Sequence, residues 1–468
     1  MHKLLTNDPL CALSNWSMKS TDNIILSGAR VFDPQTKLDK VADILIKDGI
    51  IAEIKHSVGN VDFGFRRNDG GDVVPKRRDD GEASGATVVD MRGCWILPGF
   101  CDMHVHLREP GYEHKETILT GSLAAMAGGF TTIACMPNTN PPIDNPSVFH
   151  FIKKQAAGLP VTVHPIAAIT KNREGKSLSE FAELCSVGAT AFSDDGFPVS
   201  NAGVMRVAME YCSMLDALII EHCEEPQLSM NGVMDEGRVS TALGLPGIPF
   251  ISEVIALERN IRLAQYTGAK LHIAHLSSAA SLNAIRDAKQ MRVPVTAEVT
   301  PQHLSLTSDL LRTYDTVYKV NPPLRTQKDV DALIEGIADG TIDVIASDHA
   351  PHSIDDKNVE FIEASFGMVG LETTVGLVMT KLYHSGKISL ERMVELCSLN
   401  PRRILGLESA TIEKGKVCNL TIINPDEEWK YDASSSLSKG FNSPFHNWEF
   451  RGRPKGIVNN NLICLRQT

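Results

Sequence analysis

Eight short apolar runs, separated by segments of helical length, limit what this chain can fold into more than any other feature. The runs lie at residues 99–106, 131–137, 161–169, 189–195, 217–222, 270–275, 293–299 and 343–348. Between them, segments such as 202–214 and 278–291 show helical spacing of apolar residues or helix-capping residues. Eight strand–helix alternations over about 250 residues are typical of a (β/α)8 TIM barrel, an α/β fold. A doubly wound open sheet is the alternative, but no GxGxxG motif opens a helix after the first run.

The chain changes character on both sides of these runs. Strand-like patterns separated by turn residues occur at 23–31, 41–46, 50–54, 416–423 and 456–465. We therefore expect a barrel over 99–405 and a composite small β-sandwich domain built from 23–98 and 406–468. Residues 1–22 show no period and are expected to form an N-terminal extension. The charged, glycine-rich stretch 56–86 is expected to be a surface loop.

Composition excludes several classes of protein. The chain has 468 residues, 43% hydrophobic and 22% charged, so whole-chain disorder, collagen and coiled coil are ruled out. A net charge of −11 argues against nucleic acid as the main partner. No apolar run approaches the roughly 18 residues that span a bilayer, so no membrane segment is expected. A small anionic substrate stays open, because one arginine can dominate the charge of a local site.

The cysteines and the N-terminus favour a cytoplasmic protein. The ten cysteines are scattered without a CxxC pair, which is typical of reduced, mostly buried thiols. Asp8 and Pro9 stand where a signal peptide would need an apolar core. The fifteen histidines make metal chemistry worth examining.

Polar residues end six of the eight runs. Among them are His104, His106, Asn138, Asp195, His222, His275 and Asp348. Active sites of (β/α)8 barrels lie at the C-terminal ends of the strands, so these side chains should converge. Buried charges and imidazoles need partners, and converging ones suit a metal. Four imidazoles and two carboxylates suffice for a two-metal centre bridged by hydroxide.

Strand parity sharpens the expected ligand set. His104 and His106 project from the same face of the first run, because residues i and i+2 of a strand share a face. His272 and His275 point to opposite sides of the sixth run. We expect His272 to be a structural residue with its own hydrogen-bond partners.

Four further polar residues fall near the expected barrel mouth. Arg108 follows His106 at the rim, where it is either a surface ion pair or a bidentate clamp on a substrate carboxylate. Asn138 and Asn321 lie in proline-rich loops, where a turn-forming role is the alternative. His352 could be a ligand, a substrate contact or a loop residue.

These residues lie in segments that resemble the amidohydrolase superfamily, and within it the long bacterial dihydroorotases. The segments are DMHVHLREPG (102–111), MPNTNPP (136–142), FSDDG (192–196), EHCE (221–224), HIAHLSS (272–278), VTAEVTPQHL (295–304), NPPLR (321–325) and DHAPH (348–352). HLREPG and MPNT are specific at the family level. The resemblance covers nearly the whole chain from about residue 22.

The resemblance implies a zinc centre with two ions. The implied ligands are His104, His106 and Asp348 for the first ion, and His222 and His275 for the second. Many relatives bridge the two metals with a carboxylated lysine at the end of the fourth strand. This sequence has no lysine there, and the match places the bridge on Asp195. A carboxylate bridge leaves the metal stoichiometry open, because one of the two sites can then be weak.

The implied reaction is the reversible cyclisation of N-carbamoyl-L-aspartate to L-dihydroorotate in pyrimidine (UMP) synthesis, through a metal-bound hydroxide. Asp348 would be the catalytic acid and base. The implied substrate contacts are Arg108, Asn138 and His352 for the free carboxylate, Asn321 for the pyrimidine portion, and Phe366 and Gly367 nearby. Expected partners are this small substrate, a second copy of the chain in a homo-oligomer, and aspartate transcarbamoylase. The sequence departs from relatives at Asn419, where an aspartate is usual.

Two other functions stay open at this point. An allantoinase or hydantoinase would share the barrel and the metals. Its substrate has no free carboxylate, so Arg108 would be left unpaired beside the metals at a desolvation cost. A catalytically inactive scaffold for aspartate transcarbamoylase would not need to keep metal ligands, yet all six candidates are present.

Overall fold

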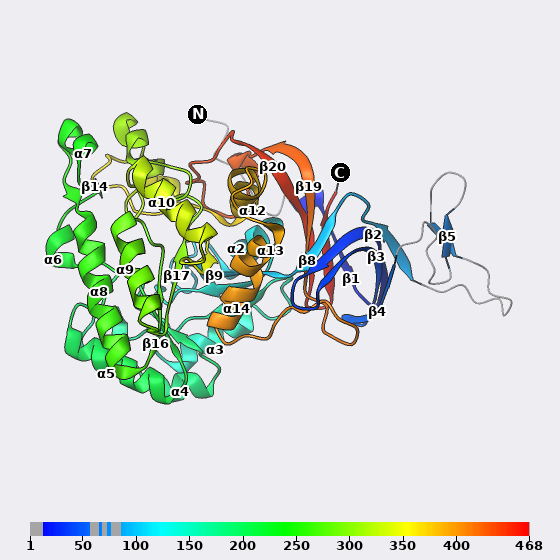
Figure 1. Ribbon diagram of the computed structural model, residues 1–468, viewed down its shortest axis with the longest axis horizontal. Coiled ribbons are helices and arrows are strands. Elements are labelled where there is room, and N and C mark those ends of the chain that lie inside the picture. The colour runs from blue at the N-terminus through cyan, green and yellow to red at the C-terminus, as the bar shows by residue number, and fades with distance from the viewer. Residues whose placement is uncertain (1–12, 57–64, 68–72, 76–85, 468) are drawn as a thin grey trace.

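The computed structural model describes residues 13–56, 65–67, 73–75 and 86–467. Figure 1 shows a helix-rich body on one side and a strand-rich body on the other, connected by several segments of the chain. The helix-rich body is the barrel that the sequence predicts. Among the described residues, no helix is both long enough and apolar enough to cross a membrane.

Eight parallel strands form the barrel, one for each predicted apolar run. They are β9 (Phe100–Val105), β10 (Phe130–Cys135), β11 (Thr162–Pro165), β12 (Ala191–Phe192), β13 (Leu218–Glu221), β16 (Lys270–Ile273), β17 (Val295–Val299) and β18 (Val344–Ile345). The first three pair in one group and the other five in a second group. Parallel bridges between Val105 and His349 and between Ala167 and Phe192 join the two groups, which closes the ring.

Helices follow the barrel strands, and several of them begin at a residue whose side chain caps the helix. The main helices are α2 (Ile118–Ala127), α3 (Pro146–Gln155), α4 (Phe181–Ser186), α5 (Ala202–Met214), α8 (Phe250–Thr267), α9 (Ala279–Gln290), α10 (Gln327–Ala338) and α12 (Leu371–Leu377). The Asn201 side chain accepts the first backbone N–H groups of α5, and Ser278 does so for α9. Both helices were expected from the sequence, at nearly these bounds.

Shorter elements fill the connections. They are η2 (Lys171–Arg173), α6 (Pro226–Ser229), β14 (Met234–Asp235), α7 (Arg238–Leu243), β15 (Gly247–Ile248), η3 (Ser308–Thr313), η4 (Thr316–Tyr318), α11 (Ile354–Lys357), η5 (Val378–Tyr383), α13 (Leu390–Val394), η6 (Glu395–Leu399), α14 (Asn400–Ile404) and η7 (Ala433–Ser435). The core of the barrel lies between strands and helices, and residues such as Phe130, Ile219 and Leu257 build it.

The strand-rich body is a nine-stranded sheet drawn from both ends of the chain. Its strands are β1 (Trp16–Ser20), β2 (Asn23–Asp33), β3 (Leu38–Lys47), β4 (Ile50–His56), β7 (Thr87–Asp90), β8 (Trp95–Pro98), β19 (Leu420–Lys430), β20 (Glu449–Asn459) and β21 (Leu462–Arg466). A core that includes Ile44, Ile96 and Ile422 joins the N-terminal and C-terminal strands. The central pairing is antiparallel, between β8 and β19.

Two sequence expectations differ from the structure in this sheet. Residues 16–20, which we assigned to an N-terminal extension, form β1 and pair antiparallel with β21. Residues 1–12 of the extension lie outside the described residues. Within the stretch 56–86, expected as a loop, β5 (Phe65–Arg67) and β6 (Val73–Pro75) pair antiparallel, and most of the remainder is also outside the described residues.

Buried hydrogen bonds connect the sheet to the start of the barrel. Gly99 links β8 directly to β9, and its carbonyl accepts from the buried guanidinium of Arg402. The same guanidinium donates to Oγ1 of Thr131 and to Oδ1 of Asn419, at 3.0 and 3.1 Å. A Cβ at Gly99 would lie 1.7 Å from the Asn419 Oδ1 atom, so only glycine fits this junction. Asn419 is therefore a structural residue of the joint.

Candidate active site

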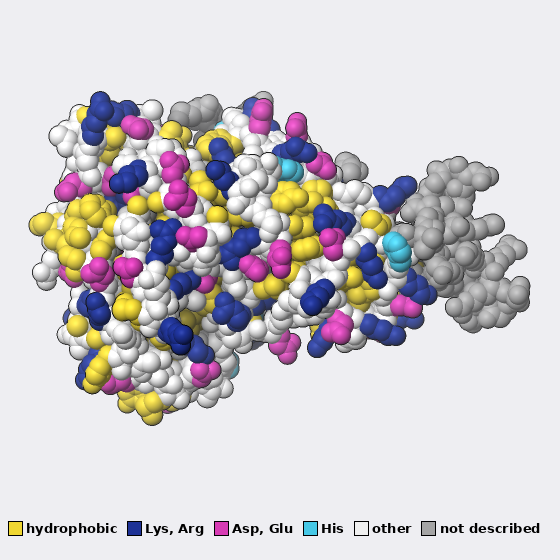
Figure 2. Space-filling view, viewed as in Figure 1, with side chains coloured by type: hydrophobic (Ala, Val, Ile, Leu, Met, Phe, Trp, Pro, Cys, Tyr) yellow, Lys and Arg dark blue, Asp and Glu magenta, His cyan; other side chains and the backbone are white. Residues whose placement is uncertain are grey.

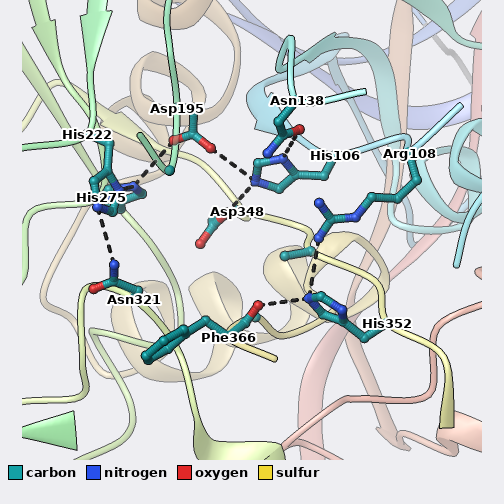
Figure 3. A pocket seen from close by; sticks show the side chains of 13 residues that line it. His106, Arg108, Asn138, Asp195, His222, His275, Asn321, Asp348, His352 and Phe366 are labelled. Carbon is teal, nitrogen blue, oxygen red and sulfur yellow. Dashed lines mark hydrogen bonds and ion pairs between the residues drawn. The ribbon is translucent and has the colours of Figure 1, made fainter. Parts of the chain in front are cut away.

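A cavity of about 200 Å³ opens at the C-terminal ends of the barrel strands. It is lined by His106, Arg108, Asn138, Asp195, Gly196, His222, His275, Asn321, Asp348, Ala350, His352, Phe366 and Gly367. Figure 3 shows their side chains converging from several loops and strands on one space. All but one of the predicted site residues lie on its wall. The exception is His104, whose side chain is fully buried against Asp195 and Asp348.

Two imidazole nitrogens and one carboxylate oxygen, the atoms of three candidate ligands, form a compact group at the end of β9. His106 Nε2 lies 3.0 Å from Asp348 Oδ1, and His104 Nε2 lies 3.6 Å from the same oxygen. Ligand atoms on one tetrahedral zinc ion are about 3.4 Å apart, because each bond is about 2.1 Å long. The separations therefore match a shared metal ion.

Asp195 lies between this group and the two remaining histidines. Its Oδ1 is 3.4 Å from His104 Nε2 and 3.7 Å from His275 Nε2, and its Oδ2 is 3.6 Å from His106 Nε2. Asp195 thus has a carboxylate oxygen within 3.7 Å of three of the four candidate histidines. His222 Nδ1 lies 3.0 Å from His275 Nε2, but His222 completes neither of the two three-residue groups that could hold a metal ion.

The residues present fit a metal. His104 Nε2 and Asp195 Oδ1 are buried polar atoms without a hydrogen-bond partner, at the place where a cation would bind them. Burial alone would lower the pKa of His104, but the carboxylates of Glu298 and Asp195 outweigh it and raise that pKa. The pKa of Asp195 is held well below its usual range despite burial, chiefly by His104. Imidazole nitrogens and carboxylate oxygens are the donors that zinc prefers.

Backbone strain accompanies three of the predicted site residues. Arg108, His275 and Asp348 have φ angles of 63°, 34° and 45°, in the left-handed region that non-glycine residues rarely adopt. Each such residue costs on the order of 1–3 kcal/mol and persists only when its surroundings hold it. The strain turns these side chains into the cavity where each strand ends.

Glu298 on β17 orients the most buried histidine. Its Oε1 accepts the Nδ1–H of His104 at 2.6 Å, which leaves His104 Nε2 free to face Asp195 and Asp348. Its other oxygen, Oε2, accepts from Nε2 of His272 at 3.2 Å. His272 thus has partners of its own, as expected for a structural histidine. A carboxylate behind a metal-ligating histidine sets the tautomer and the basicity of the ring.

Asn138 orients His106 in the same way. Its Oδ1 lies 2.9 Å from His106 Nδ1 and accepts that proton, so His106 Nε2 faces Asp348. On the other side of the cavity, Glu224 Oε2 accepts from His222 Nε2 at 3.1 Å and from Asn321 Nδ2 at 2.7 Å. Both asparagines line the cavity, but each also holds a neighbouring side chain.

His352 contacts both the backbone of Phe366 and the side chain of Arg108. Its Nε2 lies 2.8 Å from the Phe366 carbonyl oxygen and 3.4 Å from Arg108 Nη2. A carbonyl only accepts, so Nε2 carries the proton. Nδ1 then faces the Lys115 ammonium as an acceptor at 3.4 Å. Burial, together with the charges of Arg108, Lys357 and Lys115, lowers the pKa of His352 to about 2, so the ring is neutral.

Arg108 brings a positive charge into the cavity. Burial lowers its pKa to about 10, while Asp348 and Asp195 oppose the shift, so the guanidinium stays charged at neutral pH. Its Nε donates to the Pro351 carbonyl at 3.2 Å. Among the ion pairs of the described residues, none pairs Arg108 with a carboxylate within 4.0 Å. The guanidinium is thus available to a carboxylate of a ligand.

Sequence reasoning missed Glu298, Glu224 and Arg173. Glu298 had a signal, since a carboxylate inside the apolar run 293–299 must find a buried partner. Glu224 sits in the quoted EHCE segment without a role being given to it. Arg173 Nη2 donates to the Asp195 carbonyl at 2.6 Å, a contact between two loops that only the fold reveals.

Comparison with known proteins agrees with this geometry. A family model described as Dihydro-orotase-like matches residues 93–281. A Dihydroorotase from Syntrophus aciditrophicus (strain SB) is 46% identical over 431 residues, covering 92% of this chain and 96% of that protein. A Dihydroorotase from Pelotomaculum thermopropionicum is 47% identical over 443 residues, covering 95% and 98%. The chain belongs to the dihydroorotase family. It is therefore a cyclic amide hydrolase, as the sequence segments suggested.

The fold of this chain is similar to that of solved hydantoinase structures. The L-hydantoinase (dihydropyrimidinase) from Arthrobacter aurescens matches with a TM-score of 0.80 at 26% identity, covering 95% of this chain and 97% of that one. A D-hydantoinase matches with a TM-score of 0.76 at 22% identity, a likeness of fold alone. These neighbours confirm the predicted TIM barrel with a β-sandwich domain.

Proposed function

We propose that this chain catalyses the reversible cyclisation of N-carbamoyl-L-aspartate to L-dihydroorotate, the dihydroorotase reaction of pyrimidine synthesis. The observation that carries the proposal is a four-histidine, two-aspartate cluster at the base of one cavity, beside the Arg108 guanidinium, which has no carboxylate partner within 4.0 Å among the described residues. The cluster suits hydrolysis of an amide, and the cation suits a substrate with a free carboxylate.

Zinc is the proposed metal, with two ions per chain. When bound, the ions supply Lewis acidity, which lowers the pKa of a water molecule and polarises the amide carbonyl. His104, His106 and Asp348 would hold the first ion, and His222 and His275 the second, with Asp195 shared. Because His222 stands outside the compact groups and is bonded to Glu224, the second site is the weaker one.

Asp348 is the proposed acid and base. In the hydrolytic direction its carboxylate takes a proton from the attacking water and gives it to the ring nitrogen as the carbon–nitrogen bond breaks. In the synthetic direction it removes the proton from the attacking carbamoyl nitrogen. The pKa of Asp348 is below its usual value despite burial, because the contact with His106 and the charge of the neighbouring His104 favour the ionised form, so the carboxylate is ready to accept a proton.

The proposed carboxylate clamp consists of Arg108, Asn138 and His352. Arg108 supplies charge-assisted hydrogen bonds, and His352 lies beside it, with Nε2 3.4 Å from Arg108 Nη2. Asn321, Phe366 and Gly367 also line the cavity and are proposed to contact the ring. A hydantoinase activity is the second candidate, favoured by the shared fold. The unpaired Arg108 argues against it.

Turnover of four compounds by the purified protein tests the proposed function. We expect turnover of N-carbamoyl-L-aspartate and L-dihydroorotate, and none or little of allantoin and hydantoin. Turnover of only the last two would show that the proposed reaction is wrong. Absence of any activity in protein loaded with zinc would instead favour the inactive scaffold.

Replacing the proposed clamp gives a sharper test. Arg108→Ala should raise KM for N-carbamoyl-L-aspartate more than about tenfold, because one charged contact contributes about 1.5–3 kcal/mol. Arg206→Ala is a matched control, since Arg206 pairs with Glu210 on the exposed face of α5. An unchanged KM in the Arg108 variant would mean that this arginine holds no substrate carboxylate.

We further propose a cytoplasmic homo-oligomer that can assemble with aspartate transcarbamoylase, which would supply the substrate. The resemblance to the long bacterial dihydroorotases supports this. Light scattering of the purified chain, alone and mixed with the partner enzyme, would test both assemblies.

A further inference from the structure

A lysine is completely enclosed behind the wall of the cavity. Lys319 is only 2% exposed, and its ammonium donates to the carbonyl oxygens of Phe361 and Ile362 at 2.8 and 2.7 Å. The ammonium also lies 4.6 Å from the ring centroid of Phe366, within the range of a cation–π contact. Burying an amino group that can carry a charge costs free energy, so a lysine enclosed by backbone carbonyls and aromatic rings is expected to have a structural or functional role.

A second lysine binds the same region. The ammonium of Lys357, at the end of α11, donates to the carbonyls of Ser365, Thr316 and Lys319 at 2.6, 3.1 and 3.2 Å. Within the described part of the chain, neither Lys319 nor Lys357 has a carboxylate within ion-pair distance. The two lysines thus use backbone carbonyls where most buried cations use acids.

The carbonyls belong to two separate segments, 316–319 and 361–365, so the ammonium groups hold those segments together. A backbone bond from Gly367 N–H to the Lys319 carbonyl at 2.9 Å reinforces the contact. One segment leads directly to Asn321 and the other to Phe366 and Gly367. All three of these residues line the cavity.

The connection extends to the proposed carboxylate clamp. The Phe366 carbonyl accepts the Nε2–H of His352 at 2.8 Å, so the place of Phe366 sets the orientation of that ring. Gly367 packs so closely that an added Cβ would lie 3.1 Å from His352 Nε2. In Figure 3, Phe366 and His352 close one side of the cavity, opposite the metal-facing side chains. A shift of the 361–367 segment would therefore displace His352.

We propose that Lys319 and Lys357 form a two-lysine clasp that positions the substrate-binding wall, acting through Phe366, Gly367 and His352. The clasp rests on the proposed function, since it concerns the same cavity. Both lysines are positioning residues, because neither lines the cavity itself.

The test replaces each ammonium by an apolar group of similar length, in Lys319→Met and Lys357→Met, within the full chain loaded with zinc. We expect KM for L-dihydroorotate to rise about tenfold in each, which is about 1.4 kcal/mol of binding. We expect kcat to change less than about threefold and bound zinc to stay as in the parent protein, because the proposed ligands lie on other segments. Amide hydrogen exchange in residues 354–367 should accelerate.

Lys289→Met is the matched control. Lys289, at the end of α9, also donates to a backbone carbonyl, that of Thr341 at 2.7 Å, and it pairs with Asp343 at 2.7 Å. Both partners lie just before β18, at the opposite end of the barrel from the cavity. We expect its KM to equal that of the parent protein. Because Lys357 is only partly buried, its variant should fold even where Lys319→Met does not.

Two outcomes would overturn the clasp. One is an unchanged KM and unchanged exchange in a folded Lys357→Met protein. The other is a fall in kcat, a rise in KM and a loss of bound zinc that are equally large in the lysine variants and in the control. That result would indicate general destabilisation. An inactive parent protein would instead count against the proposed function, so the two failures are distinguishable.

Discussion

Three of the four candidate ligand histidines are oriented by a hydrogen bond on their other nitrogen, whereas His275 Nδ1 has no partner among the described residues. Glu298 holds Nδ1 of His104 and Asn138 holds Nδ1 of His106, so both present Nε2 to the same space. His222 is turned the other way, because Glu224 holds its Nε2. Which ring nitrogen of each histidine faces the metal position is thus determined by residues that are not candidate ligands themselves. Sequence spacing identifies the ligands but cannot identify these partners.

Glu298→Gln should weaken zinc binding. An amide in place of the carboxylate can no longer hold the His104 ring with a charged acceptor, and such changes typically reduce metal affinity by about 10–100-fold. Competition with a chromophoric zinc chelator measures the effect without relying on activity. Glu253→Gln is a suitable control, because Glu253 is a buried carboxylate that contacts Ser277 instead of a candidate ligand. Equal zinc affinity in the Glu298 variant and the parent protein would contradict this account.

Several site residues were predictable because a strand ends in them. His104, His106 and Asp348 follow apolar runs, and the geometry of a parallel barrel brings the ends of its strands together. The bridging position was harder to assign, since Asp194 and Asp195 are adjacent. The structure separates the two: Asp194 accepts the backbone N–H of Thr170 at 3.0 Å, whereas Asp195 faces the histidines.

Among the elements, the barrel strands agree with the predicted runs in number and order, but some are shorter. The run predicted at 343–348 contains only β18 (Val344–Ile345). Three residues later Asp348 has a positive φ, and its side chain lines the cavity. The strand is therefore shorter than the apolar run next to the site. The periodicity of the sequence does not reveal where the strand ends.

The strand β1 was missed because its sequence, WSMKS, does not alternate and its residues are mostly exposed. Only Trp16 is buried, at 7% exposure, with the Arg466 guanidinium 4.9 Å from its ring centroid. Its partner β21 lies near the other end of the chain, so no local sequence pattern predicts the pairing. The edge strand β1 is held by one buried side chain, Trp16, and by its pairing with β21.

Trp16→Ala should therefore destabilise this edge of the sheet. Loss of a buried aromatic side chain costs about 3 kcal/mol or more of unfolding free energy. Urea denaturation followed by circular dichroism measures it, and Met18→Ala, at an exposed position of the same strand, is the control. We expect KM to be unchanged, because β1 is remote from the cavity. Stability equal to that of the control would mean that Trp16 is not an anchor.

For the whole molecule, the division into a barrel at 99–405 and a two-part β domain at 23–98 and 406–468 stays a prediction as far as its exact boundaries are concerned. The buried contacts around Gly99 and Arg402 join the two bodies, so separate unfolding is not expected. Figure 2 shows acidic and basic side chains mixed over the visible face, with no single-sign field.

The net charge of −11 thus says little about the substrate. Positive charge is placed locally instead, by Arg108 in the cavity and by Lys115 in a neighbouring pocket that Arg108 also lines. Zinc would add to it. An acidic protein can therefore bind an anionic substrate at one point of its surface.

The most direct test of the central claim is a crystal structure of the protein with zinc and L-dihydroorotate bound. The account predicts zinc about 2.0–2.1 Å from Nε2 of His104 and of His106, and the carboxylate of the ligand on the Arg108 guanidinium. Zinc bound away from these histidines, or a carboxylate that makes no contact with Arg108, would contradict it.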